Sequence, residues 1–70
     1  MTEYAVVIED AGANFSAYVP DLPGCVAVGA SVDAVTTSIR EAIELHLASL
    51  REHGEPVPPA TSRAGTVRVA

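Results

Sequence analysis

The first part of the chain has the pattern of hydrophobic and polar residues that β-strands require. Residues 4–8 and 15–19 are rich in β-branched and aromatic side chains, and the turn-forming residues 9–14 separate them. A third short strand is predicted at residues 25–28, which end at a glycine. The pattern therefore predicts a three-stranded antiparallel meander.

The period of two along each strand also predicts what each side of the sheet carries. If Ile8 faces Phe15, one side carries a consistent apolar set. The other side is only half polar and carries Ala5, Val7, Ser16 and Tyr18. Such a side is typical of a sheet face that contacts another subunit, and equally of a merely apolar surface. Val7 and Tyr18 are therefore candidates for an oligomer interface.

A period of three to four residues begins at Val32 and predicts an amphipathic helix. Ser31 is a suitable N-cap, Gly54 suits the position after the C-cap, and the prolines that follow forbid continuation, which leaves about 21 helical residues. The apolar stripe that we expect to face the sheet comprises Val35, Ile39, Ala42, Ile43, His46 and Leu50.

This helix is expected to be longer than the sheet that it covers. It would extend roughly 30 Å, whereas a five-residue strand spans about 17 Å. Leu45 and Leu47 lie in the overhanging half, on opposite flanks of the stripe, and we predict that they have no partner within the chain. They are further interface candidates, unless the C-terminal segment folds back over one of them.

The C-terminal part contains a proline-rich connector at residues 55–65 and a short alternating segment at residues 66–69. A right-handed crossover through the helix would make this last segment a strand parallel to the first. The predicted fold class is therefore α+β in the order β-β-β-α-β, with one helix on one face of the sheet. We expect residues 1–70 to form a single domain.

The composition favours self-association. The chain has 70 residues, 49% of them hydrophobic, so it must fold, yet a core of this size is only marginally stabilising. Its one cysteine cannot form an intramolecular disulfide, and the residues needed for a structural zinc site are missing. We therefore expect a homodimer or tetramer.

The charge balance restricts the class of partner. Nine acidic residues stand against four arginines and no lysine, giving a net charge of −5, and the arginines are scattered. Direct nucleic-acid binding is therefore not expected, and a basic protein is the better partner. The chain also begins with neither a signal sequence nor a membrane span, so we expect a cytoplasmic location.

No set of residues predicts catalysis. His46 and His53 are seven residues apart on one helix, about 10 Å, which is too far for a shared metal ion. Glu41 and Glu44 lie off the buried stripe, which fits a solvated surface better than a two-metal centre. Cys25 lacks a nearby base and is predicted to be a packed thiol. We expect no catalytic residue, bound metal or cofactor.

Several motifs carry a resemblance to a known family. The segment VPDLPGC at residues 19–25 is followed by SVDA at 31–34, EAIELHL at 41–47 and GEPVP at 54–58. In this order the motifs resemble the HicB family of antitoxins, over about residues 3–59. The resemblance implies a truncated ribonuclease-H-like fold without that enzyme's activity. It also implies neutralisation of a HicA-type toxin, a small basic ribonuclease that cleaves messenger RNA, through protein–protein contact.

The resemblance also bears on the alternative functions of the chain and on the residues expected to contact a toxin. Many HicB proteins continue into a DNA-binding domain, and this chain stops before one. An oligomeric scaffold without a toxin is one alternative function, and a metal-dependent nuclease is another. The prolines and glycine of the PDLPG loop are expected to shape the fold. Candidate toxin contacts are Asp21, Leu22, Cys25, Glu41 and Glu44.

Overall fold

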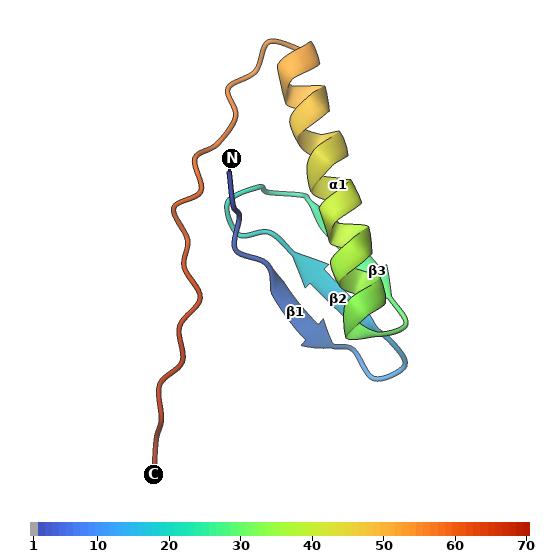
Figure 1. Ribbon diagram of the computed structural model, residues 1–70, viewed down its shortest axis with the longest axis vertical. Helices are drawn as coiled ribbons and strands as arrows, with labels where there is room; N and C mark the ends of the chain where they lie inside the picture. The colour runs from blue at the N-terminus through green and yellow to red at the C-terminus, as the bar shows by residue number, and fades with distance from the viewer. Residues whose placement is uncertain (1) are drawn as a thin grey trace.

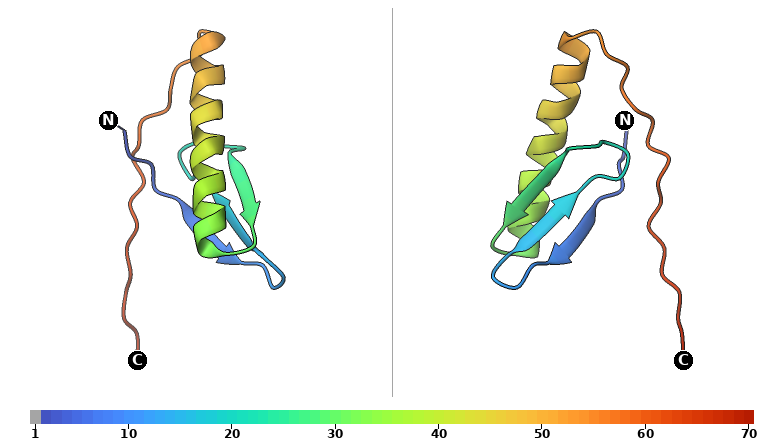
Figure 2. Two further views of the ribbon diagram at one scale, coloured as in Figure 1. Left: turned by 45° about the vertical axis from the view of Figure 1, so that its right-hand side comes forward. Right: turned by 180° about the vertical axis from the view of Figure 1, so that it is seen from behind.

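A computed structural model describes residues 2–70 as three strands followed by one long helix. The elements are β1 (Val7–Asp10), β2 (Phe15–Tyr18), β3 (Val26–Gly29) and α1 (Val32–Glu52). The strands form an antiparallel sheet in the order β1-β2-β3, and α1 crosses one face of it (Figures 1 and 2). The predicted α+β class and the predicted meander are confirmed.

The hairpin between β1 and β2 differs from the predicted one in its register. Ile8 pairs with Ala17 and not with Phe15, and β1 begins and ends later than the predicted strand. The reason is a tight turn, in which the Asp10 carboxylate accepts a hydrogen bond from the Gly12 amide at 2.9 Å. Because the register moves by two residues, each side chain keeps the face that the sequence predicts.

Two consecutive β-turns connect β2 to β3. The Leu22 amide donates to the Val19 carbonyl, and the Cys25 amide donates to the Leu22 carbonyl, each at 3.1 Å. Each turn has a proline at its second position, and Gly24 has a φ of 83°, which favours glycine. These turns place β3 one residue later than predicted, at Val26–Gly29, with Cys25 before it.

The helix is the element that the sequence predicts most closely. It spans 21 residues, and the Ser31 hydroxyl accepts a hydrogen bond from the Ala34 amide at 3.0 Å. At the other end, the Gly54 amide donates to the Arg51 carbonyl and the Glu55 amide donates to the Leu50 carbonyl. This is a Schellman motif, and the φ of 68° at Gly54 completes it.

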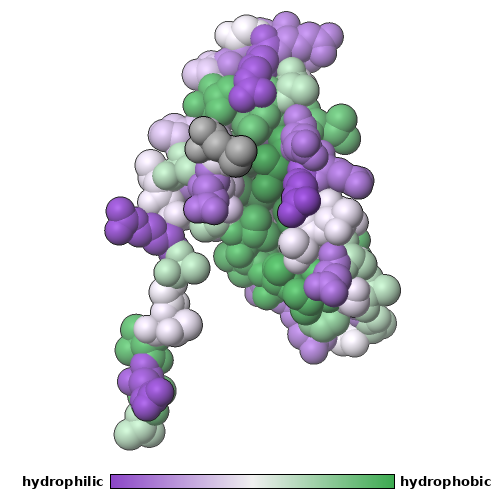
Figure 3. Space-filling model, viewed as in Figure 1, coloured by the Kyte–Doolittle hydropathy of each residue, from purple (hydrophilic) through white to green (hydrophobic). Residues whose placement is uncertain are grey.

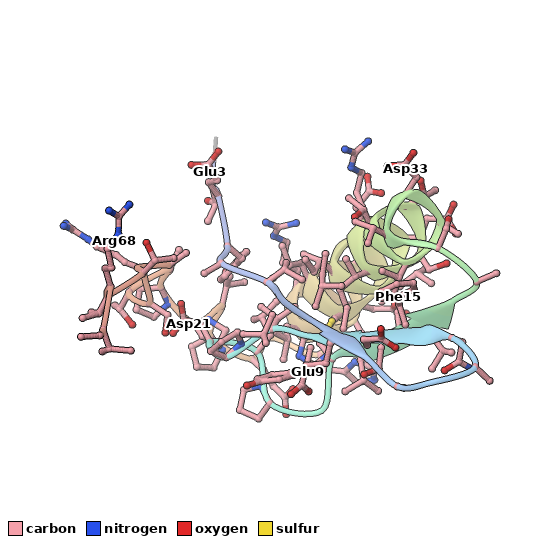
Figure 4. The ribbon with its side chains drawn as sticks, turned by 90° about the horizontal axis from the view of Figure 1, so that it is seen from below. Glu3, Glu9, Phe15, Asp21, Asp33 and Arg68 are labelled. Atoms are coloured by element: carbon pink, nitrogen blue, oxygen red, sulfur yellow. The ribbon has the colours of Figure 1, made fainter. Side chains whose placement is uncertain are left out.

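The core lies between α1 and the sheet. Among residues 2–70 its buried hydrophobic side chains are Ala17, Val19, Leu22, Cys25, Val35 and Ile39. Phe15 points from the sheet toward α1, whereas Glu9 lies on the opposite side of the sheet (Figure 4). At Gly29 the helix comes so close that a Cβ atom would lie 2.5 Å from the Val35 nitrogen. The overhang prediction needs one correction, because Leu47 packs partly against this core, while Leu45 is 73% exposed.

The tail, residues 55–70, leaves the end of α1 and returns along the β1 side of the molecule (Figure 1). Residues 66–69, predicted to form a fourth strand, lie outside the sheet, which has three strands among residues 2–70. The tail is attached nearer to the end of α1, where the Tyr4 hydroxyl donates a hydrogen bond to the Pro58 carbonyl at 2.6 Å. The last residues of the tail run away from the body of the protein (Figure 2).

Candidate functional site

The loop of residues 20–24, the proline loop, holds the tail through one carboxylate. Asp21 accepts hydrogen bonds from the backbone amides of Thr61 (3.0 Å) and Ser62 (2.9 Å). It also accepts from the hydroxyls of Thr61 (3.1 Å) and Ser62 (2.8 Å). Figure 4 shows Asp21 between the loop and the tail. These donors, with the Ser62 amide foremost, lower the pKa of the Asp21 carboxyl from its ordinary value of 3.8.

This attachment predicts that acid releases the tail. The stabilisation is fully present above pH 3.8, because the pKa of Asp21 is lower in the folded protein, and it is lost as pH falls through that lower value. We expect the amide signals of Thr61 and Ser62 in NMR spectra to shift as the pH is lowered from 6 through the lowered pKa of Asp21, because protonation of this carboxylate weakens the hydrogen bonds that it accepts. In Asp21→Asn these signals should lack that titration, and an unchanged titration would contradict the role of Asp21.

Two of the predicted toxin contacts are buried in the core. Leu22 is 0% exposed and Cys25 is 4% exposed, because the two turns of the proline loop direct both side chains inward. Burial also raises the pKa of the Cys25 thiol, which disfavours the reactive thiolate. In this conformation both side chains pack in the core, which gives them a structural role, and toxin contact at Leu22 and Cys25 stays a prediction.

Glu41 and Glu44, the acidic flank, are exposed on α1. Neither belongs to the stripe that packs on the sheet, which agrees with their predicted solvated position. Glu44 borders a groove of about 500 Å³ that is lined by apolar residues such as Val6, Ile39 and Ile43. Arg40 also lines this groove, whereas Glu41 lies outside the lining. Figure 3 shows this groove as an apolar band between α1 and the N-terminal segment. Charged side chains, among them Glu44 and Arg40, therefore stand beside an apolar surface, a combination that fits a protein partner.

The groove exists because of where α1 lies on the sheet. The helix packs mainly on β3 and β2, which leaves the β1 side of the same face uncovered. Sequence reasoning missed the groove, since it assigned the apolar stripe to a closed core. The only sequence signal for the groove was that the helix carries more apolar side chains than the small sheet can cover.

One apolar row crosses all three strands on the sheet face opposite α1, beside a second row that contains Glu9 and Ser16. Val7 pairs with Tyr18, and Tyr18 pairs with Val26, so these side chains form one row. Tyr18 is 42% exposed and Val26 is 65% exposed. The sequence singled out Val7 and Tyr18 but missed Val26 and Val28, although the alternation within the third strand would have placed both on this face.

The described residues offer little for metal or membrane binding. No three His, Cys, Asp or Glu side chains among residues 2–70 are placed to hold a metal ion together. His53 is engaged at the end of α1, where its Nδ1 lies 2.7 Å from the Ser49 carbonyl oxygen. Within the same residues, α1 lacks the run of apolar side chains that a membrane crossing needs.

A comparison with protein families identifies the family to which the chain belongs. The model of the HicB-like antitoxins of bacterial toxin–antitoxin systems matches residues 4–68. This chain belongs to the HicB-like antitoxin family. The match confirms the resemblance drawn from the motifs, and it continues through Arg68, so it includes most of the tail.

Curated relatives support the assignment to the HicB-like family. The chain is 33% identical over 66 residues to the UPF0150 protein Ta0767 of Thermoplasma acidophilum, covering 93% of this chain and 96% of that protein. It is 31% identical over 55 residues to an uncharacterized 14.9 kDa protein in the rep-hol intergenic region of Haemophilus phage HP1. That second match covers 79% of this chain and 41% of the phage protein. No solved structure matches the HicB-like chain significantly.

Proposed function

We propose that this HicB-like chain is the antitoxin of a toxin–antitoxin pair and acts by binding rather than by catalysis. Its target would be a HicA-type toxin, a small basic ribonuclease that cleaves messenger RNA. The observation that carries the proposal is the family match over residues 4–68, in a chain with a net charge of −5. Because messenger RNA is cleaved in the cytoplasm, the proposal also places the chain there.

The acidic flank is the surface that suits such a toxin best. Glu41 and Glu44 are exposed and carry the charge that complements a basic enzyme, and Glu44 borders the apolar groove. Leu22 and Cys25 are buried, and Asp21 is occupied by the tail, so these residues are less available. The contact surface would therefore be the flank together with the rim of the groove.

The decisive experiment pairs the chain with the small basic protein encoded beside its gene. Both are co-expressed, the mass of the complex is measured by light scattering, and RNA cleavage is measured with purified components. We expect a complex in which cleavage is suppressed. A toxin that cleaves unimpeded, with no complex, would contradict the antitoxin function and favour an oligomeric scaffold.

Charge reversal then tests the flank. We expect Glu41→Lys with Glu44→Lys to weaken toxin binding by roughly tenfold to a hundredfold, as lost charge pairs at interfaces do. The control is Glu52→Lys with Glu55→Lys, which makes the same charge change at exposed positions at the end of α1. Calorimetry measures both affinities. Equal weakening by the two variants would show that only net charge matters, and would contradict the flank as the contact surface.

A further inference from the structure

The end of the tail is a strand-forming segment without a sheet. Residues 63–70 are extended, and Val67 and Val69 are 87% and 83% exposed. Strand residues with this alternation normally bury one side against another layer. Val67 and Val69 share one side, and its exposure indicates that this side binds another surface. Figure 4 shows Arg68 far to the side of the sheet, which agrees with this exposure.

The same chain has a free strand edge beside an open apolar groove. The sheet order leaves β1 at an edge, and the groove next to it exposes Val6 and Ile43. A strand added along β1 would satisfy its unpaired backbone groups and would project alternate side chains over this groove. Val67 and Val69, two residues apart, have the spacing that such a strand needs.

Charge favours the same pairing. The segment from Arg63 onward contains two arginines and no acidic residue, whereas all nine acidic residues precede it. Glu9 and Asp10 lie at the end of β1, and the groove is lined by two acidic residues, Glu3 and Glu44, against one basic residue, Arg40. The basic tail segment and the acidic β1 edge have complementary charges. In a pair of copies, the tail of each copy can therefore meet the edge of the other.

The attachment of the tail keeps its end away from the β1 edge of its own chain. The hydrogen bonds of Asp21 fix Thr61 and Ser62, and a second hollow lies between Ser62 and Ala64 on one side and residues 3–5 on the other. From there the tail runs outward, which gives the chain a longest dimension of 46 Å (Figure 1). The segment is therefore presented outward, where a second copy can meet it.

We propose that residues 66–69 form a fourth strand in trans, on the β1 edge of a second copy of this chain, with Val67 and Val69 covering its groove. The exchange is reciprocal, because each copy offers one tail and one edge, and it closes at two copies. The fourth strand that the sequence predicts then exists in the dimer. This inference does not depend on the proposed antitoxin function, since its tests contain no toxin.

The first test is the mass of the purified full-length chain in solution. We expect a dimer, and we expect Val67→Asp with Val69→Asp to weaken dimerisation by roughly a hundredfold or more, because two buried valines become charged. The matched control is Thr66→Asp with Ala70→Asp, which adds the same charge to the same segment on its other face. Analytical ultracentrifugation measures each dissociation constant. A wild-type monomer at about 100 µM, or valine variants that dimerise as well as the control, would overturn the proposal.

The second test distinguishes exchange from a strand formed within one chain. In a Cys25→Ala background, one chain carries Val67→Cys and another carries Ile8→Cys, and the mixture is oxidised gently. We expect a cross-linked product with the mass of one chain of each kind, because Ile8 lies on the groove side of β1. A chain carrying both substitutions should cross-link to dimers. If it forms only an internal disulfide at monomer mass, the fourth strand lies in cis and the proposal is wrong.

Discussion

Replacing Leu22 with alanine is expected to lower the free energy of unfolding by about 2–5 kcal/mol, the usual cost of emptying a fully packed site. Leu22 is 0% exposed and lies between the two turns of the proline loop, so its side chain joins that loop to the core. A domain of this length has about 3.5–10 kcal/mol of stability in total, so this one substitution should remove a large fraction of it. Urea unfolding followed by circular dichroism measures the loss.

Leu45→Ala is the matched control for Leu22→Ala. Leu45 is 73% exposed on α1, and alanine is a good helix former, so its replacement should change the free energy of unfolding by less than about 0.5 kcal/mol. Both variants are compared at one protein concentration, because dimerisation would add to the apparent stability. Equal effects of the two variants would show that Leu22 is not packed in solution as it is in the structure.

The second large effect is expected at Gly29, where the methyl group added by an alanine substitution should push α1 away from β3. A Cβ atom there would lie 2.5 Å from the Val35 nitrogen and 2.9 Å from the Ala34 carbonyl carbon. These neighbours are backbone atoms, which no rotamer change can move, so the start of the helix must shift. We expect Gly29→Ala to cost at least about 2 kcal/mol, toward the upper end of the range for overpacking.

Gly65→Ala provides the comparison for Gly29→Ala. Gly65 has nothing within 4 Å of the position of an added Cβ atom, and its φ lies outside the left-handed region. The substitution should be neutral or slightly stabilising, since alanine reduces the entropy of the unfolded chain. Thermal unfolding of both variants measures the difference. A Gly29→Ala variant as stable as Gly65→Ala would contradict the close approach of the helix to β3.

The prediction for Leu22 bears directly on what the family motif does in this chain. The PDLPG sequence looks like a contact loop, because it carries a charged residue and its prolines and glycine are exposed. Its two turns instead place Leu22 in the core and direct the Asp21 carboxylate toward the tail. The proline loop is therefore a structural junction between sheet, core and tail, which leaves the acidic flank as the exposed candidate for partner binding.

How far the sequence predicts each element depends on how local its signals are. The helix is confirmed from Val32 to Glu52 because its caps, Ser31 and Gly54, act through hydrogen bonds within a few residues. The hairpin register was predicted two residues away from the observed one, because it depends on the hydrogen bonds of a particular turn at Asp10. A period of two cannot distinguish registers that differ by two.

The sequence by itself determined the α+β class, the meander, the helix and the family, since each rests on local pattern or on motifs in order. Only the tertiary structure decided which side chains a partner can reach: it buried Leu22 and Cys25, opened a groove beside β1, and kept the tail off the sheet. The physical reason is that burial depends on where α1 lies across the strands. That position is set by packing between residues far apart in the chain, such as the core cluster that joins Ala17 and Val19 to Ile39, which the spacing of residues along the chain does not encode.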